Sequence, residues 1–151
     1  MDETTHGLSD KVLDRAFVLE FWEIDLAGHP RWGRGDLDRD REARVRGLFQ
    51  ALMAALSPAR LHFGWRVVDD VFDYLIQAES MNGILSFDLA LDDAISAKVL
   101  PKLRGEDSAR FRESLEGCHR AFTEFNLPRA KRKVEELQSD LKTMGSARYW
   151  R

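Results

Sequence analysis

Two pairs of aspartates have the spacing with which a helix presents two carboxylates on one face. Asp69 and Asp73 are four residues apart, and so are Asp88 and Asp92. Residues four apart on a helix are neighbours, and paired carboxylates hold magnesium in enzymes that act on phosphates. Families of small all-α enzymes that work in this way usually carry denser acidic motifs. A magnesium-dependent hydrolase is therefore an alternative, and the sequence predicts no metal site.

The remaining reactive residues lack the context of a catalytic motif. The four histidines fall in no H-E-x-x-H or C-x-x-C arrangement. Cys118 lies on the apolar stripe of a predicted helix, where a packed thiol is the usual explanation. The sequence contains no glycine-rich phosphate loop of the type G-x-x-x-x-G-K-[ST]. Nothing in these motifs predicts an enzyme that works alone.

Composition describes a globular chain of about one domain. The 151 residues are 44% hydrophobic and 32% charged, which is ordinary for a soluble protein. The formal net charge of -3 provides no basic field, so direct binding to nucleic acid is disfavoured. No apolar run approaches the roughly 20 residues of a membrane span, and the N-terminus lacks the layout of a signal peptide. We expect a cytoplasmic protein without membrane contact.

Helical periodicity accounts for most of the chain. Apolar residues recur at three- and four-residue steps in five segments, at about residues 40–56, 64–79, 87–104, 111–125 and 128–144. Pro101 should kink or restart the third helix before Gly105 closes it, and Gly145 should stop the last one. The predicted fold class is mostly α, a bundle of about five helices.

The N-terminal part follows a different pattern. Residues 9–16 predict a short helix, and residues 17–24 predict a strand that is apolar on both faces. Such a strand needs cover that an isolated strand cannot supply. Residues 27–38 contain three glycines and a proline and are typical of a loop or linker.

Four stretches of sequence together carry a resemblance to a known family. They are M-D-E-T-T-H-G-L-S-D-K-V-L-D-R-A-F-V-L-E-F at residues 1–21, F-G-W-R at 63–66, L-P-K-L-R-G at 100–105 and S-A-R-Y-W-R at 146–151. The first resembles the segment after the sensor 1 asparagine in AAA+ proteins of the McrB type, the nucleotide-hydrolysing subunit of modified-cytosine restriction systems. The others look like the C-terminal helical lid of the same family.

The resemblance implies roles for two arginines. Arg15 takes the position of the finger that reaches the nucleotide of a neighbouring subunit. Gly64 and Arg66 match the G-x-R turn, in which the sensor 2 arginine contacts the terminal phosphate of the nucleotide in its own subunit. Arginine suits both roles because its planar, permanently charged fork matches phosphate oxygens. The phosphate loop, the metal-holding acidic residues and the sensor 1 asparagine would lie upstream of Met1.

The resemblance also implies an organisation and a function. Residues 1–26 would be the end of a AAA+ core, with one strand left over from its α/β sheet, 27–38 a linker and 39–151 the helical lid. In the full-length protein the lid would close over ATP or GTP with magnesium, within a ring of AAA+ subunits. Hydrolysis would drive restriction of modified DNA by an endonuclease subunit of the McrC type, so contact with DNA would be indirect. We expect the isolated chain to bind no cofactor and to hydrolyse no nucleotide.

Simpler interpretations of the same residues stay open. Arg66 has Asp69 and Asp70 three and four residues ahead, so it can form ion pairs within its helix. Arg15 lies near a predicted helix end, where a cation can satisfy the last carbonyl groups. The chain can also be a free-standing helical interaction module that dimerises, or docks on a AAA+ subunit, through residues 17–24.

Overall fold

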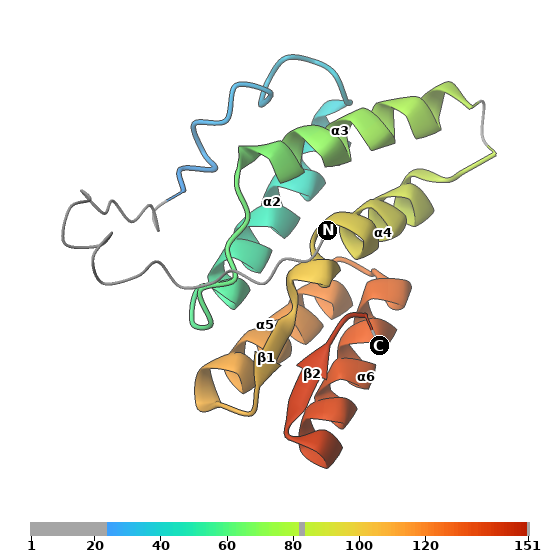
Figure 1. Ribbon diagram of the computed structural model, residues 1–151. Helices are drawn as coiled ribbons and strands as arrows, with labels where there is room; N and C mark the ends of the chain where they lie inside the picture. Colours follow the sequence, from blue (N-terminus) through green and yellow to red (C-terminus); the bar gives the residue numbers. More distant parts are fainter. Residues whose placement is uncertain (1–23, 82–83, 151) are drawn as a thin grey trace, which may run out of the picture.

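The computed structural model describes residues 24–81 and 84–150, and Figure 1 shows a bundle of helices with one small sheet. The α-helices are α2 (Arg39–Leu56), α3 (Trp65–Ser80), α4 (Phe87–Lys98), α5 (Ala109–Glu124) and α6 (Pro128–Met144). A 3-10 helix (Leu100–Lys102) precedes β1 (Arg104–Glu106), which pairs antiparallel with β2 (Ser146–Arg148). The predicted mostly α bundle of about five helices is confirmed. The predicted helix at 9–16 and nearly all of the strand at 17–24 lie outside the described residues.

Local chemistry explains most of the helix ends. The side chains of Asp38, Ser86 and Ser108 each accept a hydrogen bond from the amide three residues ahead, at 2.9 to 3.3 Å. Such N-caps satisfy amides that have no partner within the helix. At its C-terminus, α6 ends before Gly145, whose φ of 71° lies in the left-handed region. This ending was predicted from the glycine.

The helices pack as two hairpins and a fifth helix, α2, which lies beside one of them. In Figure 1, α3 and α4 form the upper hairpin and α5 and α6 the lower one, while α2 runs along α5. The hairpins meet where α4 packs on α6. The largest fully buried side chains include Phe49, Phe63, Phe72, Phe122, Leu48, Leu52 and Leu91. The apolar stripes that predicted the helices thus form one shared core.

Helices α5 and α2 approach each other closely at Gly117. A Cβ atom on Gly117 would lie 2.7 Å from the Cβ atom and 3.0 Å from the Cα atom of Ala55. Backbone atoms cannot turn away as a side chain can, so any larger residue at 117 would push α2 and α5 apart.

The segment around Pro101 differs from the prediction. Instead of a kinked helix through Arg104, α4 ends at Lys98, a 3-10 helix carries Pro101, and Gly105 lies in β1. Proline removes an amide donor and clashes with the preceding turn, which ends the α-helix. A Cβ atom on Gly105 would lie 3.0 Å from the ring of Phe111. The glycine therefore allows the ring to lie against β1, and does not act as a helix stop.

A buried carboxylate connects the two hairpins. Asp92 on α4 is 1% exposed, and its two oxygens accept the amides of Arg129 (2.8 Å) and Ala130 (2.9 Å) at the start of α6. The residue before α6 is Leu127, which has no polar side chain, and Pro128 has no amide hydrogen. Asp92 therefore caps α6 from another helix, and its negative charge lies at the positive end of the helix dipole.

Within the described residues, no helix is both long enough and apolar enough to cross a lipid bilayer.

Removal of the Asp92 carboxylate should destabilise the bundle. We expect Asp92→Ala to lower the free energy of unfolding by about 3 kcal/mol, because two amides at the start of α6 lose their charged acceptor. Urea denaturation followed by circular dichroism measures this loss. Asp93→Ala is the matched control, since Asp93 forms an ion pair with the exposed Arg129 and should contribute less than about 1 kcal/mol. Equal losses for the two variants would contradict the capping role.

The thiol of Cys118 is predicted to be inert in the folded protein. Cys118 is fully buried on α5, and burial raises the pKa of its thiol to about 12. Because the reactive form is the thiolate, the folded protein should react with a thiol reagent at pH 8 far more slowly than the urea-unfolded protein. The unfolded thiol ionises near pH 8.5, so this group should also reduce stability as the pH rises from about 9 toward 12. Labelling at equal rates with and without urea would contradict the packed position.

Candidate functional site

Arg66 lies at an open helix end. It is the second residue of α3, and its side chain is exposed. Gly64, the residue before the helix, has extended backbone with φ −88° and ψ 180°. A Cβ atom on Gly64 would meet no atom of the described residues within 4 Å, so the immediate surroundings of Gly64 are open in this part of the chain. The two residues of the predicted G-x-R turn therefore come together on an accessible surface.

The N-terminus of α3 differs from the other described helix starts. Asp38, Ser86 and Ser108 cap α2, α4 and α5, and Asp92 caps α6, whereas no side chain caps α3. The first turn of α3 also contains no acidic residue. The Val67 amide donates to the carbonyl of Gly64 at 3.0 Å, whereas the amides of Trp65 and Arg66 have no partner among the described residues. These two amides and the positive end of the dipole are thus available to an anion, beside a guanidinium group.

The aspartates that could pair with Arg66 have other partners. Asp70 accepts a hydrogen bond from the Lys98 ammonium at 2.9 Å. Asp69 lies 3.5 Å from Nε2 of His29 and 3.9 Å from Arg31. Among the described residues, Arg66 has no ion pair with either aspartate. The simpler interpretation of Arg66 as a member of an intrahelical pair is therefore not what the structure shows.

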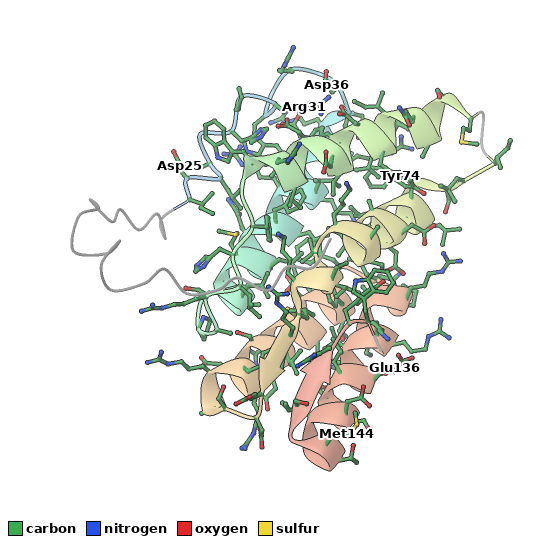
Figure 2. All side chains as sticks on the ribbon, viewed as in Figure 1. Asp25, Arg31, Asp36, Tyr74, Glu136 and Met144 are labelled. Atoms are coloured by element: carbon green, nitrogen blue, oxygen red, sulfur yellow. The ribbon has the colours of Figure 1, made fainter. Side chains whose placement is uncertain are left out.

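A loop that precedes α2 is held against α3 by Arg31. The Arg31 guanidinium donates to Asp36 (3.1 Å), to the carbonyl of Asp69 (3.0 Å) and to Asp73 (2.6 Å). Figure 2 shows Asp25, Arg31 and Asp36 near the N-terminal half of α3. Partial burial alone would lower the pKa of Arg31, but the hydrogen bonds and charges of Asp73 and Asp36 raise it. Arg31 therefore stays charged and fixes the loop.

Aromatic side chains fix the same loop close to Arg66. Trp65 donates from Nε1 to the carbonyl of Asp25 at 2.8 Å. The buried ring of His29 makes edge contacts with Trp65 at 5.1 Å and with Trp32 at 5.9 Å between centroids. The residue just before Arg66 is thus attached to the loop. Leu26 and His29 of this loop are buried against the bundle, whereas its glycines and its proline are exposed.

The aspartate pairs that suggested magnesium serve structural roles. Asp73 binds Arg31, Asp88 binds Arg44, and Asp92 caps α6. Among the described residues, no group of three or more His, Cys, Asp or Glu side chains could hold a metal ion. Both members of each aspartate pair do lie on one helix, as the spacing predicted. This spacing shows only that two side chains share a helix face, and it does not show what they bind.

Arg15 is the other predicted site residue, and His119 is one of the four histidines for which no catalytic motif was found. Arg15 lies outside the described residues, so its finger role stays a prediction. The Nε2 atom of His119 lies within hydrogen-bond distance of Oε1 of Glu135, at 3.0 Å. Arg31 and Trp65, which attach the loop to α3 near Arg66, were not identified from the sequence, because their partners are distant in the chain and no local spacing reveals them.

Loss of the Arg31 side chain should release the loop. We expect Arg31→Ala to increase hydrogen–deuterium exchange of residues 25–37, because three contacts worth about 1 to 3 kcal/mol together would be lost. Exchange in α5 and α6 should not change. Arg34→Ala is the matched control, an exposed arginine in the same loop. Unchanged exchange in the Arg31 variant would show that the loop is held by its aromatic contacts.

Comparison with known proteins identifies a family but no characterised relative. Neither the curated proteins nor the solved structures include a match to this chain. A family model matches residues 27–146, which include most of the loop at residues 25–36, all five described α-helices and the start of β2. Because this match covers most of the chain, the protein belongs to the family described as a domain of unknown function, DUF8727.

Proposed function

We propose that this chain is the C-terminal segment of a McrB-like AAA+ NTPase, and that α3 contacts the nucleotide. The observation that carries the proposal is the exposed guanidinium of Arg66 beside a helix N-terminus that no described side chain caps. Residues 39–151 would form the lid. The G-x-R turn would supply Arg66 as sensor 2, with Gly64 allowing close approach of the phosphate.

The physical argument rests on what this helix end can bind. The amides at a helix N-terminus point toward an anion, and the helix dipole favours negative charge there. An adjacent arginine adds charge-assisted hydrogen bonds to phosphate oxygens. Since neither Asp69 nor Asp70 pairs with Arg66, the guanidinium can turn toward such an anion without breaking an ion pair in the described part of the chain.

The attachment of the loop supports a mechanical role for this site. Trp65 is tied to the Asp25 carbonyl, and Arg31 ties the loop to the next two turns of α3. In the proposed protein this loop leads to the AAA+ core. A shift of α3 on binding phosphate would therefore be transmitted to the core through these contacts.

The rest of the proposal follows from the sequence resemblance. ATP or GTP with magnesium would be held by a core that includes residues 1–26, and Arg15 would act as the finger in a neighbouring subunit. The ring would work in the cytoplasm with an endonuclease subunit of the McrC type, which restricts modified DNA. The chain alone would hydrolyse neither nucleotide.

A second candidate is a free-standing helical interaction module. One observation favours it: the family match covers residues 27–146 as a unit, without the segment 1–26 that would belong to the core. This candidate requires no phosphate contact at Arg66, so one experiment separates the two.

Tripolyphosphate is a suitable probe for the full chain of 151 residues. We expect its addition to shift the amide signals of residues 64–67 in ¹H–¹⁵N NMR spectra, with an affinity of about 1 mM, because a single helix end and one arginine hold the anion. Arg66→Ala should weaken binding by about fivefold or more. With ATP or GTP, phosphate release should stay at the level of the buffer.

The matched control is Arg110→Ala. Arg110 is also an exposed second residue of a helix, but Ser108 caps that helix. Tripolyphosphate binding should not change in this variant. If residues 64–67 do not respond, or if both variants weaken binding equally, the phosphate contact is wrong and the interaction module is favoured.

A further inference from the structure

Two arginine side chains face each other across the small sheet. Arg104 of β1 is the register partner of Arg148 of β2. Farther along the same ladder, the Asp107 amide donates to the carbonyl of Gly145 at 2.8 Å, so this pair is hydrogen-bonded. Hydrogen-bonded and non-hydrogen-bonded pairs alternate along an antiparallel ladder, and three steps separate the two pairs. Arg104 and Arg148 are therefore a non-hydrogen-bonded pair, the kind with Cα atoms about 4.5 Å apart and the closer side chains.

Both arginines lie on the outer face of the sheet. Ala147 is 1% exposed, and a Cβ atom on Gly105 would lie 3.0 Å from the ring of Phe111, so these strand residues face the bundle. Successive side chains of a strand point to opposite faces, which places Arg104 and Arg148 on the other face. Both are exposed, and Figure 1 shows the two strands side by side next to α6. The two guanidinium groups are thus accessible from solvent.

The facing arginines have no neutralising partner in the described part of the chain. Neither forms an ion pair or a hydrogen bond between its side chain and a described residue. Arg112 provides a contrast, because its guanidinium donates to both oxygens of Asp107, at 2.5 and 2.7 Å. Like charges directly opposite each other destabilise a sheet. An anion that enters between Arg104 and Arg148 would replace this repulsion by two attractions.

We infer that Arg104 and Arg148 form a clamp for a phosphomonoester. A guanidinium fork binds two oxygens of a carboxylate or of a phosphate. A carboxylate has only two oxygens for two forks, whereas a phosphomonoester has three terminal oxygens and a charge of about −1.5 to −2 at pH 7. The second fork and the second charge therefore select a phosphomonoester over a carboxylate. A small molecule and a phosphorylated side chain of a partner protein share this chemistry.

The neighbouring pair on the same face determines where the phosphate lies. Glu106 is opposite Ser146 and shares the outer face with the arginines. Glu106 is the diagonal neighbour of Arg148, but the two side chains form no ion pair, and its carboxylate would repel the ligand. The phosphate should therefore lie on the other side of the arginine pair. Trp150 follows Arg148 on that side and is 73% exposed, so its signals can report binding.

The test uses the full chain with methyl phosphate as the probe. We expect the amide signals of residues 104–106 and 146–150 to shift in ¹H–¹⁵N NMR spectra, with an affinity of about 1 mM. Because the second ionisation of a phosphomonoester lies near pH 6, binding should tighten about fivefold between about pH 5 and pH 7.5. Methyl sulfate keeps a single negative charge over this range, so it should bind more weakly and without this pH dependence.

The peptide acetyl-Gly-phosphoserine-Gly-amide distinguishes the two sources of phosphate. Tighter binding of the peptide than of methyl phosphate would assign the phosphate to a partner protein. Equal binding would assign it to a small molecule. Both results require that the shifts include residues 104–106 and 146–150.

Arg148→Gln separates binding from folding. This variant should bind methyl phosphate about fivefold or more weakly, and without phosphate it should be at least as resistant to thermal unfolding as the native chain, because a facing charge is removed. The response of residues 64–67 to tripolyphosphate should not change, so this result is independent of the phosphate contact proposed for Arg66.

Arg120→Gln is the matched control. Arg120 is an exposed arginine on the side of α5 that faces α2, and it forms no ion pair with a described residue. Methyl phosphate binding should not change in this variant. The inference would be overturned by an absence of shifts in the two strands, by equal weakening in both variants, or by methyl sulfate binding as tightly as methyl phosphate.

Discussion

The carboxylate of Asp92 is the contact on which the arrangement of the two helical hairpins depends. Every amide at the start of α6 can be accounted for: Leu127 donates to the carbonyl of Phe122, Pro128 has no hydrogen to donate, Arg129 and Ala130 donate to Asp92, and Lys131 donates to Leu127. Two of these bonds cross from one hairpin to the other. A charged group at 1% exposure costs free energy unless it is hydrogen-bonded, so α4 and α6 can meet only in the position that satisfies Asp92. Apolar packing alone tolerates sliding, whereas this contact fixes the register of the hairpins.

The N-terminus of α3 stands out because side chains cap the N-termini of the other described α-helices. The N-cap residues of α2, α4 and α5 accept hydrogen bonds from the first turn of their own helices, and Asp92 of α4 does so for α6. Four of the five described α-helices thus have a polar side chain that caps the N-terminus. At α3 the corresponding residue is Gly64, and the first turn contains an exposed arginine in place of an acidic residue. Stability alone would favour a cap there, because Ser or Asp in place of Gly gains a few tenths of a kcal/mol or more. A helix N-terminus that lacks a side-chain cap, and whose first two amides have no partner among the described residues, is suited to an anion from outside the bundle.

Local patterns predicted the helices well because the physics of those elements is local. The apolar steps of each stripe, Pro128 at a helix start and Gly145 at a helix end act within one or two turns. Local patterns did not identify a role that depends on a residue distant in the chain. Gly105 was interpreted as a helix stop, but its function is to leave room for the ring of Phe111. Asp92 was considered as a metal ligand only in an alternative interpretation. In the structure its carboxylate accepts hydrogen bonds from amides of α6, more than thirty residues along the chain. The candidate site also combines local and distant features. The G-x-R turn can be recognised in the sequence, whereas the contacts of Trp65 and Arg31 that join the loop to α3 cannot.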